Sequence, residues 1–202
     1  MKLRGMRRIA WLVAYVIMAS ATYAQAPTDV PVVKVSPAGS TIKFAVKASV
    51  SIEGTFDKWD ATLTFTSDHV VDGVLDIKIQ AASVNTGSRM KDDKLKGKDF
   101  FNADQDPYIT FRSTKISRTG PSSFDMPGTF TIRGVSKPET LSFTGKGTGG
   151  RGHGEITGTM AFDRKEFGMN SGIPFIKIAD RVEVSVNLIV DRVSGPPLVF
   201  KQ

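Results

Sequence analysis

The sequence contains no cysteine and only two histidines among its 202 residues. A chain without cysteine forms no disulfide, carries no thiolate metal ligand and offers no thiol for a lipid anchor. The two histidines, His69 and His153, stand in predicted turns, and neither has a second histidine at metal-ligand spacing. Because a zinc site needs three or four suitable ligands, the sequence predicts no metal centre.

An apolar run long enough to span a bilayer is also missing. The longest run extends from Ile9 to Ala21, about 13 residues, where a transmembrane helix needs about 20. A basic segment precedes this run, and small residues follow it up to Ala24. These features are typical of an export signal. We therefore predict a signal peptide at residues 1–24, cleaved after Ala24, and a mature protein without a membrane anchor. The alternative is a transmembrane anchor at the same place.

Positive charge is in small excess once this segment is set aside. The chain has 27 Lys and Arg against 20 Asp and Glu, and four of the basic residues but none of the acidic ones precede Ala24. The remainder therefore carries a net charge of about +3, which is a weak signal for a basic nucleic-acid-binding face. We expect no nucleic-acid partner.

The sequence does contain a regular alternation of apolar and polar residues. Between Arg181 and Asp191, every second residue is Val or Leu, beginning at Val182. Successive side chains of a strand point to opposite faces, so such a strand has one apolar and one polar face. The pattern recurs along most of the chain and predicts an all-β protein of about eight main strands. These strands bury their apolar faces by curling into a sandwich or a closed barrel.

Three segments depart from this alternation. Pro37–Ser40 predicts a turn between a brief strand, Val32–Val35, and a long strand, Thr41–Val50. Arg89–Phe101 is charged and has its apolar residues spaced as in a helix, which predicts one short helix that folds over the barrel. The two prolines that follow Ser194 predict a frayed C-terminal tail.

Most of the 13 phenylalanines and many aliphatic residues fall at predicted inward positions. The interior of an eight-stranded barrel is either filled by such side chains or holds one ligand, and the sequence leaves both open. If the barrel is hollow, we expect a long, narrow apolar tube. The predicted lining residues are Phe44, Val46, Phe56, Leu63, Phe65, Ile77, Ile79, Leu95, Phe100, Ile109, Phe111, Phe130, Ile132, Phe143, Phe162, Val184 and Val186.

Residues suited to catalysis are few. Asp92, Asp93, Asp99, Asp104 and Asp106 form an acidic cluster, but they are interspersed with lysines, as on a solvated, charge-balanced surface. Neither a nucleophile elbow nor a phosphate-binding loop occurs in its required context. We therefore predict that the protein is not an enzyme and needs no cofactor. An enzyme that uses Asp92 on a lipid is the alternative.

Several short motifs follow one another in a recognisable order along residues 32–191. They include Gly54-Thr55-Phe56, Ser83-Val84-Asn85-Thr86, Asp99-Phe100-Phe101, Gly134-Val135-x-Lys137-Pro138 and Arg164-x-x-Phe167-Gly168-Met169. Together they resemble the YceI-like family of bacterial periplasmic proteins. The resemblance implies a lipocalin-like antiparallel barrel over residues 32–191, followed by a tail at residues 192–202. It also implies a polyisoprenoid ligand inside the barrel, such as a quinone or prenol lipid.

Two positions depart from the family pattern. Lys47 and Lys94 stand where family members often carry histidine, so we predict that these lysines contact the head group of the ligand. Lysine suits an acidic head, such as a phosphate or carboxylate. We expect a periplasmic carrier or store of an isoprenoid or other amphiphilic lipid, as a monomer or a homodimer. The alternatives are a stress-response interaction module with a packed barrel, or an enzyme acting on such a lipid.

Overall fold

The structure is a computed structural model that describes residues 29–49, 51–147, 152–172 and 177–200. The predicted signal peptide, residues 1–24, lies outside the described residues. The strands are β1 (Val32–Ala48), β2 (Ile52–Phe56), β3 (Trp59–Phe65), β4 (Gly73–Gln80), β5 (Val84–Asn85), β6 (Tyr108–Ser113), β7 (Ser117–Arg118), β8 (Ser123–Ile132), β9 (Val135–Gly147), β10 (His153–Asp163) and β11 (Ile178–Ser194). The helices are α1 (Arg89–Lys96) and three short 3₁₀ turns, η1 (Val70–Asp72), η2 (Ala81–Ser83) and η3 (Arg164–Phe167).

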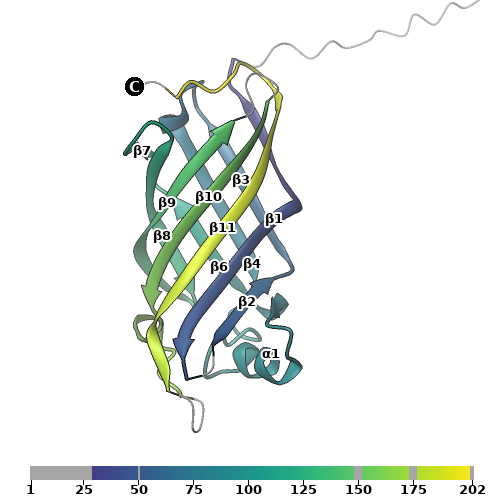
Figure 1. The fold of residues 1–202 in the computed structure, drawn as a ribbon, viewed down its shortest axis with the longest axis vertical. Helices are drawn as coiled ribbons and strands as arrows, with labels where there is room; N and C mark the ends of the chain where they lie inside the picture. Colours follow the sequence, from purple (N-terminus) through teal and green to yellow (C-terminus); the bar gives the residue numbers. More distant parts are fainter. Residues whose placement is uncertain (1–28, 50, 148–151, 173–176, 201–202) are drawn as a thin grey trace, which may run out of the picture.

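Eight of these strands form a closed antiparallel barrel (Figure 1). Each neighbour in the order β1-β3-β4-β6-β8-β9-β10-β11 is hydrogen-bonded to the next, and β11 pairs with β1 to close the ring. Closure removes the free strand edges that an open sheet would expose. The predicted lipocalin-like barrel of about eight strands with one short helix is confirmed.

Strand β1 is one long strand and not the two that the sequence predicted. Ser36 pairs with Ile189 of β11 and Thr41 pairs with Asn187, so the residues between Ser36 and Thr41 form a bulge inside the strand. Gly39 adopts a left-handed conformation there, with φ of 82°. The Ser40 hydroxyl accepts a hydrogen bond from the Ile189 amide at 2.7 Å and holds the bulge against β11. Proline and glycine signal a bulge as readily as a turn, which explains the wrong prediction.

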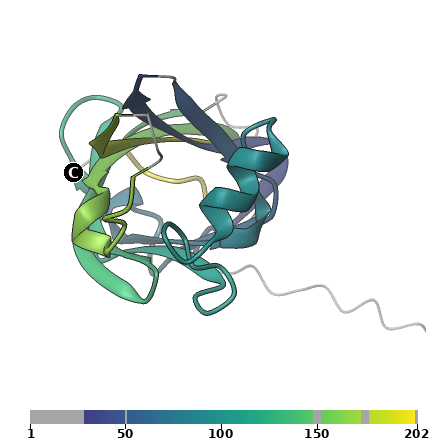
Figure 2. The same ribbon diagram turned by 90° about the horizontal axis from the view of Figure 1, so that it is seen from below.

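The end of the barrel drawn lowest in Figure 1 carries β2, β5 and α1. The second half of β1 pairs with β2, and β2 pairs with β5, which leads into α1. Seen along the barrel, α1 covers one side of this rim and η3 lies on another side (Figure 2). Asp92 holds the start of α1, because its Oδ1 accepts hydrogen bonds from the Thr86 amide at 2.8 Å and the Thr86 hydroxyl at 2.7 Å.

The opposite end is crossed by the C-terminal residues. Strand β11 continues to Ser194, beyond the predicted end of the barrel at residue 191. Val199 forms a parallel bridge with His69, and its amide and carbonyl bond to Asp68 and Val70 at 2.7 and 3.0 Å. The expectation of a frayed tail is wrong for these residues. The prolines stop β11, but the residues after them are free to pair elsewhere.

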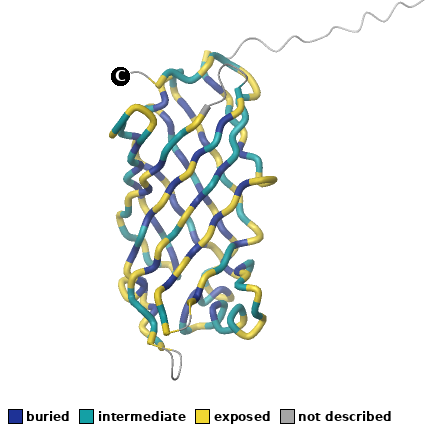
Figure 3. The backbone as a smooth tube through the Cα atoms, in the orientation of Figure 1, coloured by how far each residue is buried: buried dark blue, intermediate teal, exposed yellow. Residues whose placement is uncertain are grey.

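Burial follows the alternation that the sequence shows (Figure 3). Buried and exposed residues alternate along the barrel strands, as in β1, where Ile42, Phe44 and Val46 are buried and Lys43 is exposed. The buried side chains point into the ring, and the exposed ones cover its outer surface. The register of each strand therefore decides which residues reach the interior.

Candidate functional site

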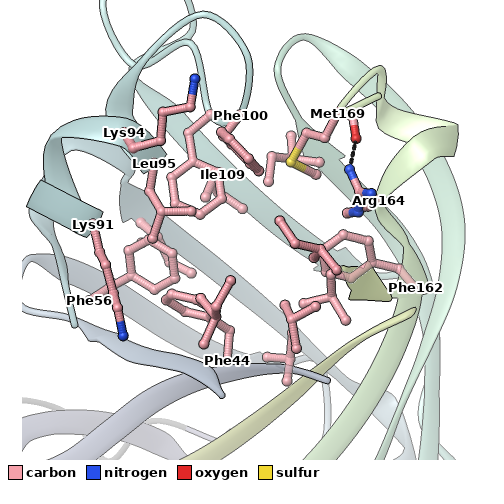
Figure 4. A pocket seen from close by; sticks show the side chains of 18 of the residues that line it. Phe44, Phe56, Lys91, Lys94, Leu95, Phe100, Ile109, Phe162, Arg164 and Met169 are labelled. Carbon is pink, nitrogen blue, oxygen red and sulfur yellow. Dashed lines mark hydrogen bonds between the residues drawn. The ribbon is translucent and has the colours of Figure 1, made fainter. Parts of the chain in front are cut away.

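A cavity of about 430 Å³ opens inside the barrel at the end covered by α1. We call it the lower cavity; its wall is built by inward side chains of β1, β2, β4, β6, β8, β10 and β11 together with α1. Figure 4 shows aromatic and aliphatic side chains converging on its centre. The predicted lining residues found in this wall are Phe44, Val46, Phe56, Ile79, Leu95, Phe100, Ile109, Phe130, Ile132, Phe162 and Val184.

The other predicted lining residues lie elsewhere in the barrel. Leu63, Phe65 and Phe143 line a second cavity near the opposite end, which we call the upper cavity. Ile77, Phe111 and Val186 are buried but line neither cavity. The expected single long tube is therefore divided. Inward side chains fill the barrel at mid-height and leave a cavity at each end.

Aromatic rings stiffen two sides of the lower cavity. On one side, Phe44, Phe56 and Phe101 have ring centroids 5.6 to 6.3 Å apart. On the other side, Phe130 and Phe162 lie 5.0 Å apart, and both contact Phe167. Such tilted and edge-to-face contacts add stability beyond the burial of the rings. The wall is therefore a built surface, suited to hold an apolar molecule.

Gly54 gives the Phe44 ring its space. A Cβ at position 54 would lie 2.9 Å from two atoms of that ring, closer than side-chain atoms normally approach. The structure places Gly54 inside β2. The glycine is needed there for a close approach rather than for a turn.

The charged residues that line the lower cavity are all cationic: Lys91, Lys94 and Arg164. Lys94 Nζ lies 2.6 Å from Asp99 Oδ2, and this hydrogen bond to Lys94 lowers the pKa of Asp99 below its ordinary value. Lys91 is half-buried and, among the described residues, has no acidic partner. Lys47 is exposed and faces outward from β1, apart from the residues of the wall.

Arg164 is a structural clamp at the mouth of the lower cavity, with only 6% of its surface exposed. Its guanidinium donates to the backbone carbonyls of Met169, Ala179 and Ser171 and to Asp180 Oδ1, which lies 3.1 Å from Nη2. Figure 4 shows the bond to Met169. The hydrogen bond from Lys165, with further help from Arg164, lowers the pKa of Asp180. These contacts fix the chain on both sides of residues 173–176.

The sequence analysis missed several residues of this wall. They are Ile42, Ile52, Ser88, Met90, Lys91, Phe101, Arg164, Met169, Ile178 and Val182. Ile42 and Val182 follow the same alternation as their predicted neighbours, so the strand pattern could have identified them. Arg164 and Met169 belong to a motif that was recognised but given no place in the site. Ile52 and Ile178 are the first residues of β2 and β11, and the rest come from α1 and the segments beside it, where no period-two pattern points inward.

The described residues contain no group of three or more His, Cys, Asp or Glu side chains that could hold a metal ion. Among them there is also no helix with the length and hydrophobicity needed to cross a membrane. The lower cavity offers an apolar wall with Lys91, Lys94 and Arg164 as its charged groups.

Comparison with known proteins places this barrel in a family. A protein of Pseudomonas savastanoi pv. phaseolicola, named UPF0312 protein, is 29% identical over 133 residues, which cover 64% of this chain and 69% of that protein. The crystal structure of Burkholderia cenocepacia BcnA is similar with a TM-score of 0.70 and 27% identity, over 77% of this chain and 99% of that one. A polyisoprenoid binding domain from Saccharophagus degradans shares the fold, with a TM-score of 0.61 and 12% identity over 80% of this chain and 99% of that one. The profile described as YceI-like domain matches residues 34–190, and the chain belongs to the YceI-like family.

Proposed function

We propose that the protein binds a lipid with a long apolar chain, such as an isoprenoid, in the lower cavity and serves as a soluble carrier or store. The observation that carries the proposal is the apolar cavity of about 430 Å³ inside a closed barrel. Its volume is within the roughly 300–1,000 Å³ usual for small-molecule sites. The solved relative described as a polyisoprenoid binding domain supports the fold, and the cavity of this chain supports the ligand class.

Burial of the lipid tail supplies the binding energy. Each methylene that leaves water contributes roughly 0.8 kcal/mol, so a chain of several isoprene units gains enough without specific polar contacts. The loss of the tail's conformational freedom offsets part of this gain. The length and width of the cavity would then select the ligand, which is consistent with a site that has no catalytic constellation. A binding protein, rather than an enzyme, fits this arrangement, and Asp92 serves to hold the start of α1.

The cations at the mouth favour an acidic head group. Lys91 and Lys94 lie in the cavity wall, so a phosphate or carboxylate at the mouth would find at least one ammonium group. Lys47 lies near the C-terminal end of β1, at the same end of the barrel, but on its outer face. Its predicted role as a head-group contact stays a prediction, and Lys47→Ala belongs in the test beside Lys91→Ala and Lys94→Ala.

The proposed compartment is the periplasm, reached by cleavage of residues 1–24. The basic and apolar pattern of these residues and the membership of the family support this proposal. N-terminal sequencing of the exported protein would test it, with Gln25 expected as the first residue.

Extraction of the purified protein with organic solvent, followed by mass spectrometry, tests the ligand. We expect one equivalent of an amphiphilic lipid per chain. Val184→Trp should abolish this binding, because Val184 faces the cavity and a tryptophan there would fill it. Glu183→Trp places the same ring on the exposed outer face of β11 and should leave binding unchanged. Lipid bound equally by both variants would contradict the proposal, as would an extract without lipid and no uptake of added isoprenoid.

A further inference from the structure

The upper cavity has no role in the function proposed above. It has a volume of about 370 Å³, and its wall includes the apolar side chains of Leu63, Phe65, Met126, Phe143 and Ile156. Leu198 and Phe200, from the chain that crosses this end after β11, complete the wall. The centroid of the Phe200 ring lies 6.1 Å from that of Phe124, so the C-terminal residues pack on the barrel rather than stand away from it. This volume is again within the usual range for a small-molecule site.

A layer of packed side chains separates the two cavities. No residue lines both of them, and the side chains between them, which we call the middle layer, are almost completely buried. The middle layer comprises Leu75, Ile77, Phe111, Leu141, Val186 and Leu188. Since closely packed interiors leave few voids, a tail in one cavity does not extend into the other without displacing this layer. A ligand of the lower cavity therefore does not reach the upper cavity, which can be occupied only by a ligand of its own.

Arg192 brings a positive charge to an inward position of this mainly apolar wall. Arg192 pairs with Val33 in the β1–β11 ladder, and both line the upper cavity, so the arginine faces the inside of the barrel. Lys146, His153 and Glu155 also line this cavity, but they alternate along β9 and β10 with the inward positions of the buried Gly154 and Ile156.

The guanidinium of Arg192 has donors to spare. Its Nη1 donates to the Gly195 carbonyl at 2.5 Å, and among the described residues it has no carboxylate partner. A guanidinium carries five N–H donors in a planar fork, of which one is used here. Such a fork matches a carboxylate, which accepts two parallel hydrogen bonds from it.

We propose that the upper cavity is a second ligand site that takes an aliphatic carboxylate, with the chain among Leu63, Phe65 and Phe143 and the carboxylate on Arg192. The chemistry of the wall sets this class: an apolar chamber with one inward cation accepts a chain with an anionic end. The site works independently of the lower cavity, and both can be occupied at once.

Isothermal titration with decanoate and with decanol tests this proposal on the full-length mature chain. With the lower cavity filled by Val184→Trp, we expect decanoate to bind at one equivalent, and Arg192→Gln to weaken this binding about tenfold or more, since hydrogen bonds to charged groups are among the strong ones. Binding of decanol should not change in this variant. Lys34→Gln removes the same charge from an exposed position of β1 that lines neither cavity and pairs with Asp191, so it serves as the matched control and should leave decanoate affinity unchanged. Arg192→Lys should retain part of the affinity and checks that the loss in Arg192→Gln is not misfolding.

Two further variants distinguish decanoate bound in the upper cavity from decanoate bound in the lower cavity. Val184→Trp fills the lower cavity and should still bind decanoate with unchanged affinity, whereas Phe143→Trp should reduce it. The proposal is overturned if decanoate shows no saturable binding, if Val184→Trp abolishes it, or if Arg192→Gln and Lys34→Gln weaken it equally. The proposed function predicts that Val184→Trp loses the long-chain lipid, whereas the second site predicts that the same variant keeps decanoate. Each proposal can therefore fail without affecting the test of the other.

Discussion

Among single residues, Asp99 decides how much positive charge the mouth of the lower cavity presents. Its hydrogen bond with Lys94 lowers the pKa of the carboxyl, so the stabilisation from this pair is present above the ordinary pKa of an aspartate. It is lost only as the pH falls through the lowered value. At neutral pH, the carboxylate of Asp99 therefore offsets part of the positive charge of Lys94. Lys91 is then the cation available to a ligand.

Replacement of Asp99 should change the selectivity for the head group. Asp99→Asn removes the competing carboxylate and leaves Lys94 free to bind an acidic head. We expect the affinity for an isoprenyl phosphate to rise several-fold and that for the corresponding alcohol to stay constant, as measured by competition with a fluorescent lipid. An equal change for both ligands would show that Lys94 does not contact the head group.

The buried guanidinium of Arg164 should contribute strongly to stability. Arg164→Gln leaves several backbone carbonyls without their donor, and a loss of about 3 kcal/mol in the free energy of unfolding is expected. Arg181→Gln removes an exposed arginine whose ion pair with Glu183 spans 3.7 Å, and it should change stability by less than about 0.5 kcal/mol. Urea denaturation of both variants measures the difference, and similar losses would contradict the clamp.

Among the strands, β6 and β8 approach each other closely at Gly128. A Cβ at that position would collide with the carbonyl of Arg112 in the neighbouring strand. Gly128 pairs with Ser113, whose hydroxyl accepts a hydrogen bond from the Leu75 amide at 2.9 Å. The glycine therefore lets three strands, β4, β6 and β8, pack together where the barrel is filled.

A methyl group at Gly128 should disturb this contact. Gly128→Ala is expected to destabilise the protein by about 1–3 kcal/mol, because overpacking forces the backbone apart. At Gly145, the added Cβ would meet only a Phe200 ring atom at 3.9 Å, so Gly145→Ala should be tolerated. Thermal unfolding followed by circular dichroism distinguishes the two variants. A neutral Gly128→Ala would mean that the strands can separate without loss.

The alternating pattern predicted the strands well, because a strand with one buried face has a period of two. Helix α1 was predicted from its spacing of apolar residues, and the structure confirms it. The bulge at Pro37–Ser40 could not be told from a turn, since both use the same residues. The pairing of Val199 with residues 68–70 is a contact between distant segments, and local pattern carries no signal of it.

For the whole molecule, the central question from the sequence was whether the barrel is filled or hollow. Both answers hold, at different heights: the middle layer is packed and the ends are open. The sequence could predict which side chains point into the barrel, because that follows from the alternation along each strand. It could not predict at which height along the barrel axis each of these side chains lies, because the height depends on the tilt of each strand and on where the bulge in β1 shifts the register. This explains why Phe111 and Phe130 are opposite each other in the β6–β8 ladder but only Phe130 reaches the lower cavity.

Removal of part of the middle layer should join the two cavities. Phe111→Ala is expected to lose about 3–5 kcal/mol of stability, as for other large-to-small changes in a core. It should also allow a longer isoprenoid chain to enter from the lower cavity. The measurement is the length of the longest lipid retained after incubation with a mixture of chain lengths. An unchanged length distribution would show that the two ends do not communicate even through this gap.

The pairing of β1 with β11 also governs how the chain folds. Val33 is paired with Arg192 in the β1–β11 ladder, and Val46 is paired with Val182. The ring therefore closes only when segments far apart in sequence meet. Such non-local pairing slows folding, because the entropy of closing a long loop is lost before the contacts form. Until β11 pairs with β1, the folding chain exposes two strand edges whose backbone N–H and C=O groups are unpaired. An export chaperone that shields those edges would therefore raise the yield of native molecules.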